Sequence, residues 1–216
     1  MAAAVAPGLP PRRSLRGVLI ASAGCFLALA LAVGFMPSLP GDTAVREALL
    51  ALASPPVLAA MRLINRAGSW QLLLPGSLLL LLAFRRARER WYVWVGLMIA
   101  APATEGILKI IIGRPRPEAA SMGFPSGHAT AAAAFFGAVF YLAESLRPPA
   151  RRLVRAAALV VIVLVAAARV MLRAHWPSDA LGGIALGLTL ASAAALLAGA
   201  GSVVTATPAG SRVDKW

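Results

Sequence analysis

Long apolar stretches make up most of this chain, and they restrict it to one class of fold. Of its 216 residues, 60% are hydrophobic and only 13% are charged, and the mean hydropathy is +0.79. A soluble domain of this length could not cover so much apolar surface, so the composition indicates an integral membrane protein. The single cysteine, Cys25, excludes an internal disulfide.

Six apolar segments follow one another along the chain, and we expect each to form a membrane-spanning helix. They are Gly17–Met36, Trp70–Phe84, Trp91–Leu108, Ala129–Leu146, Leu153–Arg169 and Ala180–Ala200. The second is short for a span and contains Pro75, so it either begins earlier, near Ile64, or tilts little. We therefore predict an all-α fold: a single domain over residues 1–216, built as a bundle of six transmembrane helices, with flexible tails at 1–14 and 202–216.

Basic residues between the segments predict the orientation of the bundle. One face receives 13 of the 21 Lys and Arg residues, including the runs within 12–16, 85–90 and 147–155. The positive-inside rule then places both termini and these loops in the cytoplasm, in an inner or plasma membrane. The net charge of +13 does not indicate nucleic-acid binding, because the basic residues form short clusters and no stripe with interleaved aromatics.

The segment between the first two spans then lies outside. Residues Asp42–Leu52 and Val57–Ala67 carry apolar side chains at helical spacing. We expect two short amphipathic helices that lie at the outer interface and are separated at Pro55-Pro56. Two roles remain open for them: a structural cap, or a frame around the opening through which a lipid substrate arrives.

Three polar clusters interrupt the apolar sequence. They are Lys109–Pro117, Pro125–His128 and His175–Asp179. Polar and basic residues are costly near hydrocarbon, so three such clusters require a chemical reason. In a six-span bundle all three lie at the outer ends of helices, together with Arg169 at the end of the fifth segment. We therefore predict one site on the periplasmic or extracellular face.

The residue types at this predicted site suit a phosphate group. Lys109, Arg116 and Arg169 can surround an anion, and the two guanidiniums can donate in pairs to its oxygens. Ser126 and Gly127 stand where a helix begins. The Ser hydroxyl can cap that helix, and backbone N–H groups at such a position point at bound oxyanions.

The only two histidines of the chain supply the reactive groups. Asp179 follows His175 by four residues, so its carboxylate can accept a hydrogen bond from one imidazole nitrogen and leave the other free to attack. His128 can donate a proton to the departing oxygen.

The three clusters together resemble the signature of the type 2 phosphatidic acid phosphatase (PAP2) family. That signature reads Lys, six residues, Arg-Pro; then Pro-Ser-Gly-His; then Ser-Arg, five residues, His, three residues, Asp. Here the parts run from Lys109 to Arg116-Pro117, from Pro125 to His128, and from Ala168-Arg169 through His175 to Asp179. Ala168 stands where the family usually has Ser, which affects a secondary hydrogen bond and not the mechanism.

The resemblance implies a membrane enzyme that hydrolyses a lipid phosphate through a phosphohistidine. His175 would be the nucleophile, oriented by Asp179, and His128 would protonate the leaving group. The other signature residues would bind the phosphoryl oxygens: Lys109, Arg116, Ser126, Gly127 and Arg169. We expect no metal or other cofactor, because the sequence offers no ligand set with zinc spacing and no carboxylate cluster for magnesium.

The substrate and the acceptor stay open at this stage. The resemblance favours a polyprenyl (undecaprenyl) diphosphate, with phosphatidic acid, phosphatidylglycerophosphate and lipid A phosphate as alternatives. A lipid phosphotransferase would use the same phosphohistidine, and a lipid or anion transporter is the non-enzymatic alternative. Arg114 and Arg173 either contact a second phosphate or head group or are interfacial charges. Glu105 either pairs with a site cation, lines a wet cavity or takes part in catalysis.

Overall fold

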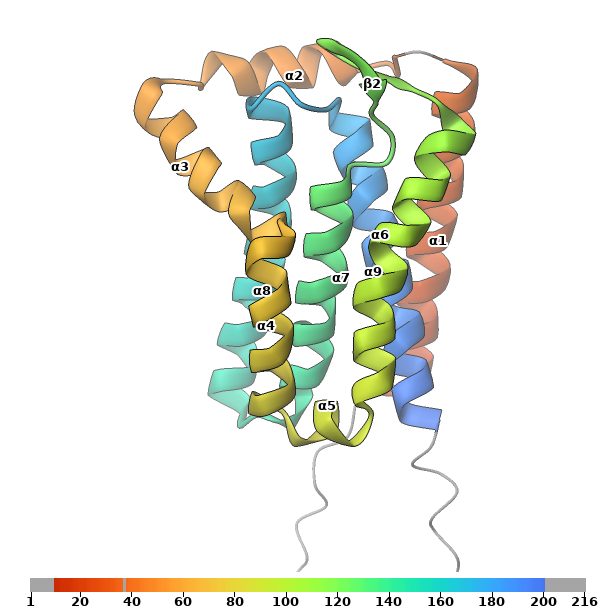
Figure 1. Ribbon diagram of the computed structural model, residues 1–216, viewed down its shortest axis with the longest axis vertical. Coiled ribbons are helices and arrows are strands. Elements are labelled where there is room, and N and C mark those ends of the chain that lie inside the picture. The colour runs from red at the N-terminus through yellow and green to blue at the C-terminus, as the bar shows by residue number, and fades with distance from the viewer. Residues whose placement is uncertain (1–9, 37, 201–216) are drawn as a thin grey trace, which may run out of the picture.

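The computed structural model describes residues 10–36 and 38–200, and in this part the chain is a helical bundle (Figure 1). The elements, in chain order, are α1 (Arg12–Phe35), α2 (Asp42–Ala51), α3 (Pro55–Asn65), η1 (Arg66–Gly68), α4 (Trp70–Ala83), α5 (Arg85–Glu89), α6 (Trp91–Ile112), β1 (Pro115–Arg116), β2 (Ala119–Met122), α7 (Gly127–Leu142), η2 (Ala143–Ser145), α8 (Pro148–Met171) and α9 (Pro177–Ala200).

Each of the six apolar segments contains one α-helix, and these helices fall into two groups by length. Four of them, α1, α6, α8 and α9, have 22 to 24 residues and are long and apolar enough to cross a membrane. The other two are shorter: α4 has 14 residues and α7 has 16, which correspond to about 21 and 24 Å of helix. The described residues therefore hold four candidate spans, or five if α2 and α3 count as one bent span. The second segment begins at Trp70, and Ile64 belongs to α3.

The expected break between the two short helices is present. Helix α3 begins at Pro55, and its axis is bent by 116° from that of α2. Proline is tolerated in the first turn of a helix, where its missing N–H would be unpaired in any case. Figure 1 shows α2 lying across the upper end of the bundle, with α3 descending from it toward α4.

A two-stranded hairpin corrects the all-α prediction. Strands β1 and β2 pair antiparallel, with Pro115 opposite Met122 and Arg116 opposite Ala119. The hairpin follows α6 directly, because Gly113 adopts a left-handed conformation (φ 65°) and donates its N–H to the carbonyl of Lys109. The prolines that follow cannot continue a helix, so the chain folds back over the upper end.

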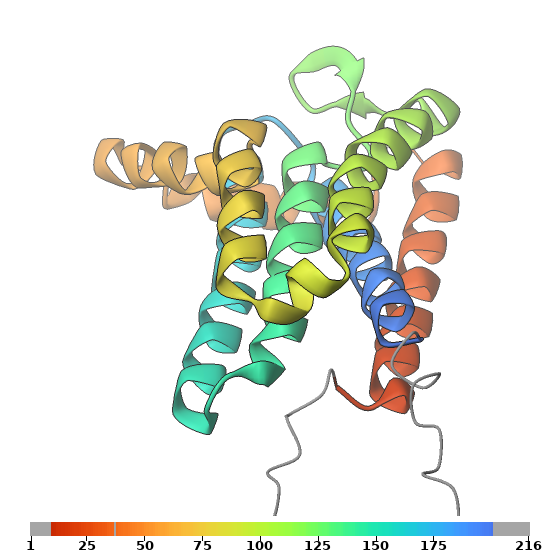
Figure 2. The ribbon, with the colours of Figure 1, turned by 60° about the horizontal axis from the view of Figure 1, so that its bottom comes forward.

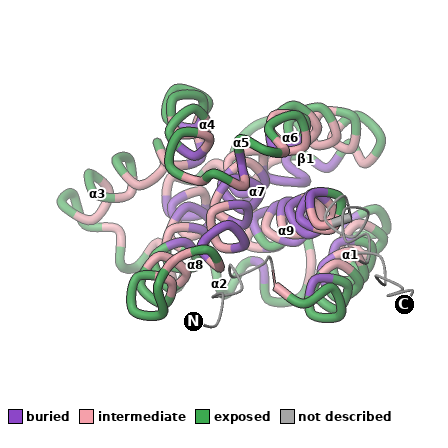
Figure 3. Tube along the Cα trace, turned by 90° about the horizontal axis from the view of Figure 1, so that it is seen from below, coloured by how far each residue is buried: buried purple, intermediate pink, exposed green. Residues whose placement is uncertain are grey.

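Helix α7 is at the centre of the bundle, and it is mostly buried (Figure 3). It packs closely against α9 because that helix presents glycines to it. A Cβ atom added to Gly183 would lie 2.6 Å from the carbonyl oxygen of Ser126, and one added to Gly187 would lie 2.5 Å from that of Thr130. Close backbone approach through small residues is the usual way in which membrane helices associate.

The helices alternate in direction, and this brings distant parts of the sequence to one end. The C-terminal ends of α6 and α8 and the N-terminal ends of α7 and α9 share the upper end of Figure 1, which we call the site end (Figures 1 and 2). Helix α5, η2 and the start of α8 lie at the opposite end. The predicted N-terminal tail, about residues 1–14, overlaps the start of α1, which begins at Arg12. Residues 1–9 and 202–216 of the predicted tails lie outside the described residues, whereas Pro10 and Pro11 are described.

Candidate active site

The three polar clusters, far apart in sequence, meet at the site end. Lys109 lies in the last turn of α6 and Arg169 in the last turn of α8, whereas Ser126, Gly127 and His128 begin α7. His175 lies in the turn between α8 and α9, and Asp179 lies in the first turn of α9. The electrostatic surroundings of His128 include Arg169, His175, Lys109 and Arg116. Every residue singled out in the sequence therefore belongs to one region.

His175 and Asp179 form the geometry that was predicted for an oriented nucleophile. The imidazole Nδ1 lies 3.4 Å from Oδ2 of Asp179, and the same carboxylate oxygen accepts the backbone N–H of Trp176 at 3.0 Å. Helix α9 begins at Pro177, which places the carboxylate in the first turn, where the helix dipole favours a negative charge. Both side chains are buried.

Burial also sets the protonation state of His175. Removal from water lowers the pKa of His175 below its ordinary value of 6.5, and the nearby guanidiniums of Arg169 and Arg116 act in the same direction. The hydrogen bond to Asp179 opposes the shift but does not reverse it. The neutral imidazole is therefore the stable form near pH 7. With Nδ1–H facing Asp179, the lone pair is on Nε2.

Two polar groups at the start of α7 and the end of α8 are buried without a partner among residues 10–36 and 38–200. They are the Oγ of Ser126 and the Nε of Arg169. The expected capping role of Ser126 is thus wrong, since its hydroxyl makes no cap hydrogen bond to α7. Its backbone N–H instead donates to the carbonyl of Asp179 at 3.0 Å, which ties the start of α7 to α9. A buried polar group left unpaired costs about 1–3 kcal/mol, so two such groups together indicate a ligand.

The cations around these groups are held by the fold in different ways. Arg169 donates from Nη1 to Oδ1 of Asn65 at 3.0 Å, and Arg116 donates from Nε to the carbonyl of Met122 at 3.2 Å. Lys109 forms an ion pair with Glu105 one turn earlier in α6. Glu105 itself reaches the start of α7, because a Cβ on Gly127 would lie 2.9 Å from its Oε1.

A cleft of about 750 Å³ opens beside the start of α7. Its wall includes Asn65, Ser69, Glu105, Gly127 and His128. Two of the roles considered for Glu105 are therefore present together, since it pairs with a site cation and lines the cleft. His175 does not line this cleft and has only 1% of its surface exposed.

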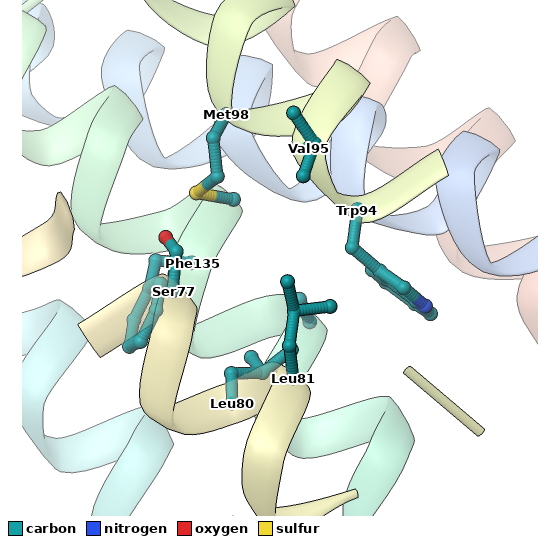
Figure 4. A pocket seen from close by; sticks show the side chains of 8 residues that line it. Ser77, Leu80, Leu81, Trp94, Val95, Met98 and Phe135 are labelled. Atoms are coloured by element: carbon teal, nitrogen blue, oxygen red, sulfur yellow. The ribbon is translucent and has the colours of Figure 1, made fainter. Parts of the chain in front are cut away.

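An apolar groove of about 500 Å³ continues from the cleft along α4, α6 and α7. Trp70, Pro102 and Ala131 belong to the walls of both. Further along, side chains of α4, α6 and α7 surround a smaller hollow, in which Leu81, Met98 and Phe135 face one another (Figure 4). An apolar surface thus leads from the polar site end into the middle of the bundle.

Arg114 and Arg173, whose roles the sequence left open, occupy very different places. Arg114 is 2% exposed and donates to Ser178 and Asp179 of α9 and to Asp42 of α2. It is therefore an internal residue and not an interfacial charge. Arg173 is largely exposed, has a positive φ of 61°, and pairs with Glu118 of the hairpin at 2.9 Å.

No cluster of three or more His, Cys, Asp or Glu side chains that could hold a metal ion occurs within the described part of the chain. The groups gathered at the site end include cations, two imidazoles and the N-termini of α7 and α9. Such a set binds and polarises an oxyanion, and it offers an imidazole nitrogen as the attacking atom.

Comparisons with known proteins agree with this geometry. A crystal structure of a transmembrane PAP2-type phosphatidylglycerolphosphate phosphatase from Bacillus subtilis is similar to this chain, with a TM-score of 0.73 and 26% sequence identity. The similarity covers 89% of this chain and 98% of that one. Comparison with curated proteins gave no match. Residues 90–200, which contain all three polar clusters and just over half of the chain, match the PAP2 superfamily, and the chain belongs to that superfamily.

Proposed function

We propose that this chain, a membrane phosphatase by its family, hydrolyses a lipid phosphate or diphosphate through a phosphohistidine on His175. One observation carries the proposal. The Oγ of Ser126 and the Nε of Arg169, which have no partner within the described residues, lie in a region that His175 and His128 share, and the apolar groove joins this region on the His128 side.

The groove and the cleft together fit a lipid with a phosphorylated head. The groove has apolar walls formed by α4, α6 and α7, and the cleft that it joins is lined in part by polar groups of the site. A lipid can then leave its chain in apolar surroundings while its phosphate reaches the cations. A small soluble phosphate ester would leave the groove unfilled, so the arrangement favours a lipid substrate.

The position of the groove also indicates which histidine performs which step. Phosphoryl transfer proceeds with the attacking and departing oxygen or nitrogen on opposite sides of phosphorus. The lipid is the leaving group, and its groove reaches His128 and not His175. His128 therefore lies on the leaving-group side, and His175 attacks from the other side.

In the first step, Nε2 of His175 forms a bond to phosphorus and the bond from phosphorus to the lipid oxygen breaks. His128 gives its proton to that oxygen, so the lipid leaves as an alcohol, or as a monophosphate if the substrate is a diphosphate. Lys109, Arg116, Arg169, Ser126 and the N–H of Gly127 hold the three phosphoryl oxygens, whose charge they stabilise.

In the second step, water replaces the lipid and attacks the phosphohistidine. His128, now neutral, accepts a proton from this water as the new oxygen–phosphorus bond forms and the bond to Nε2 breaks. Inorganic phosphate leaves and both histidines return to their starting states. Asp179 stabilises the positive charge that develops on His175 while its nitrogen is bonded to phosphorus.

The membrane arrangement that goes with this function is one domain of six spans over residues 1–216. The short helix α4 would cross with the help of η1 before it and α5 after it, and α7 with the help of the segment after β2 before it and η2 after it. Helices α2 and α3 would lie at the outer interface and frame the opening of the cleft. The site end would face the periplasm or exterior, with both termini in the cytoplasm, as the distribution of Lys and Arg favours.

Two substrate classes have separate support. A polyprenyl (undecaprenyl) diphosphate follows from the family resemblance of the sequence, as do phosphatidic acid and lipid A phosphate. Phosphatidylglycerophosphate has the additional support that a similar solved structure is described as a phosphatase for that lipid. Both classes combine a terminal phosphate with an apolar part, as a polar cleft joined to an apolar groove requires.

The decisive experiment measures inorganic phosphate released by the purified protein in detergent, with excess chelator and without any added acceptor. The panel contains a polyprenyl diphosphate, phosphatidylglycerophosphate, phosphatidic acid, lipid A phosphate and, as the soluble comparison, glycerol phosphate. We expect at least one lipid to be hydrolysed far faster than glycerol phosphate. Dependence on an added metal would contradict the mechanism, and release of phosphate only with a lipid alcohol present would identify a phosphotransferase.

A pair of variants tests the groove itself. Ala131→Phe adds a ring where cleft and groove meet, so it should raise KM for the lipid substrate about 10-fold with a smaller change in kcat. Ile110→Phe adds bulk of the same kind to an exposed position of α6, and it should leave both constants unchanged. Equal effects of the two variants would argue against a lipid chain in the groove. In sealed liposomes, substrate flux that survives His175→Ala would instead identify a transporter.

A further inference from the structure

Behind the His175–Asp179 pair lies a second layer of buried charge that the signature does not include. Arg114 donates from Nη1 to Oδ1 of Asp179 at 2.6 Å and to Oγ of Ser178 at 2.7 Å. Its Nη2 donates to Oδ2 of Asp42 at 2.7 Å. The side chains of Arg114, Asp42 and Asp179 are between 0% and 3% exposed, so the whole network is shielded from water.

The network fixes the orientation of the Asp179 carboxylate. Its Oδ2 faces the imidazole Nδ1 and the N–H of Trp176, and its Oδ1 is held by Arg114. If only one of its oxygens were held, the carboxylate of Asp179 could rotate about the Cβ–Cγ bond. Such a rotation would move Oδ2 away from His175. Groups that hold a ligand or catalytic side chain from behind commonly change activity 10- to 100-fold when they are removed.

Asp42 is fixed just as firmly, although it lies 72 residues from Arg114 in the sequence. Its Oδ1 accepts the N–H of Ser178 at 2.9 Å, and its Oδ2 accepts the hydroxyl of Ser178 at 2.7 Å and the N–H of Leu39 at 3.1 Å. Burial alone would raise the pKa of Asp42, but the hydrogen bonds from Ser178, Arg114 and Leu39 hold it below 3.8. Asp42 is therefore a carboxylate.

The charges in the network do not balance. One guanidinium serves two carboxylates, so these three side chains together carry one net negative charge. Without Asp42, the full charge of Arg114 would act on Asp179 and weaken it as an acceptor for the imidazole. Without Arg114, Asp42 and Asp179 would lose the cation that they share, and the full charge of Asp179 would act on the imidazole.

We propose that Arg114 and Asp42 are positioning residues for phosphoryl transfer: together they orient Asp179 and set the negative charge that acts on His175. The proposal rests on the function proposed above, in which His175 is the nucleophile. It also gives α2 a role in catalysis, because Asp42 connects that helix to the first turn of α9.

The test is the protonation equilibrium of His175 itself. The charged groups that face His175 come from four elements: Asp179 on α9, Arg169 on α8, Arg116 on β1 and His128 on α7. Replacing His128 by Gln leaves His175 as the single histidine of the chain. Ring-¹⁵N histidine incorporated into that protein then gives NMR signals of one imidazole, whose tautomer and pKa can be followed without any substrate.

Three variants in this single-histidine background should change the pKa of His175 in three different ways. Asp42→Asn leaves Arg114 to act on Asp179 alone, so the pKa of His175 should fall by about 1. Arg114→Gln removes the cation, so the pKa should rise by about 1. The double variant removes one charge of each sign and so restores the original net charge of the three side chains, and the pKa of His175 should return close to that of the parent protein.

The matched control is the exposed ion pair at the same end, Arg173 with Glu118, which does not touch Asp179. Arg173→Gln should leave the pKa of His175 and the kinetics unchanged. If Arg114→Gln does not fold, the comparison of Asp42→Asn with the charge-balanced double variant still decides the matter. Shifts of equal sign in both single variants, or no shift in Asp42→Asn, would overturn the proposal.

Kinetics with both histidines present complete the test. Arg114→Lys keeps the charge but not the paired donors, so kcat should fall about 10- to 100-fold while KM changes less than about threefold. A rise in KM at constant kcat would mean that Arg114 binds substrate and does not position Asp179. If no lipid phosphate is hydrolysed at all, the NMR result still stands or falls independently, so the two proposals fail separately.

Discussion

The two ends of the bundle contain ion-pair networks of the same size and opposite sign. At the site end one cation, Arg114, is shared by two carboxylates, Asp42 and Asp179, and the side chains are at most 3% exposed. At the opposite end one carboxylate, Glu144, is shared by Arg151 and Arg155 at 2.5 Å each, and these side chains are 21–30% exposed. The same arrangement therefore occurs once in a dry environment and once in contact with water.

Burial decides what each network can do. A solvent-exposed pair contributes about 0–1 kcal/mol, whereas breaking a buried pair by removing one partner costs about 3–5 kcal/mol. The buried network also leaves a net charge that acts on neighbouring groups, because little water is present to screen it. The exposed network at the opposite end connects η2 to α8, and it sits where lipid head groups and water can replace it.

The two ends also differ in the partners of their polar side chains. At the site end Ser126 and Arg169 keep buried polar atoms without a partner in the described chain. At the opposite end Arg155 uses its Nε on the carbonyl of Phe140 at 3.2 Å, and its guanidinium lies 4.6 Å from the centre of the Phe140 ring. Among the described residues the Nε1 of Trp94, near the opposite end, is also buried without a partner, so the site end differs in that the groups of Ser126 and Arg169 lie among cations and imidazoles.

The largest effect is expected from His175→Ala. Removing the attacking nitrogen should reduce phosphate release by about 10³-fold or more, while the phosphate-binding cations stay in place. The measurement is phosphate release together with detection of acid-labile, alkali-stable phosphate bound to the parent protein during turnover. Glu144→Gln at the opposite end is the control and should keep full turnover. Substantial turnover by His175→Ala would remove His175 from the nucleophile role.

A smaller effect, with an unusual sign, is expected from Ser126→Ala. Loss of one donor to the phosphoryl oxygens should lower kcat about 10²-fold. The same change removes a buried hydroxyl that has no partner in the described residues, so the protein should become more stable, by about 1 kcal/mol. Thermal unfolding and phosphate release measured on one preparation test both expectations.

Ser192 provides the matched control for Ser126. It is equally buried, but its hydroxyl is hydrogen-bonded to that of Tyr141 at 2.7 Å, far from the polar clusters. Ser192→Ala should therefore lower stability and leave activity unchanged, the reverse of Ser126→Ala. Loss of stability in both variants would mean that the hydroxyl of Ser126 stabilises the fold, and it would argue against a role in binding a ligand.

Acidification should lower the stability of the folded protein through His175 at the site end. The pKa of His175 is below 6.5 in the folded protein and near that value in the unfolded chain, so the unfolded state binds more protons as the pH falls below 6.5. Stability should then decline by about 1 kcal/mol per pH unit between the two pKa values. In a His128→Gln background the unfolding temperature should fall as the pH decreases from 7 to 5. Adding His175→Gln should remove that slope.

The sequence predicted what depends on periodicity and on alternation of direction. Six apolar segments became six helices, and the parity of the spans correctly brought Lys109, His128 and His175 to one end of the bundle. The hairpin was missed because its strands have only two and four residues, too few for an alternating pattern.

The second layer of the site could not be predicted, because nothing local marks it. Asp42 looked like an ordinary first residue of a helix, and it meets Arg114 only when α2 crosses the site end. Ser126 had the sequence position of a helix cap, but tertiary packing directs its N–H to α9 and leaves its hydroxyl without a partner among the residues that the structure describes. A buried triad of one cation and two carboxylates depends on three segments of the chain at once, and no spacing rule relates these segments.

The smallest effect is expected from Glu144→Gln, and it is the sharpest check on the comparison of the two ends. The variant removes the shared acceptor of Arg151 and Arg155, but all three side chains are partly exposed, so the freed guanidiniums can turn to water or lipid phosphate. Stability should fall by less than about 1 kcal/mol, and kcat and KM should not change. The corresponding change at the site end, Asp42→Asn, removes one of two carboxylates from a buried guanidinium and should cost several times more, about 3 kcal/mol. If thermal unfolding shows equal losses of stability for the two variants, burial does not distinguish the two networks. The role of Arg114 and Asp42 as positioning residues must then be abandoned.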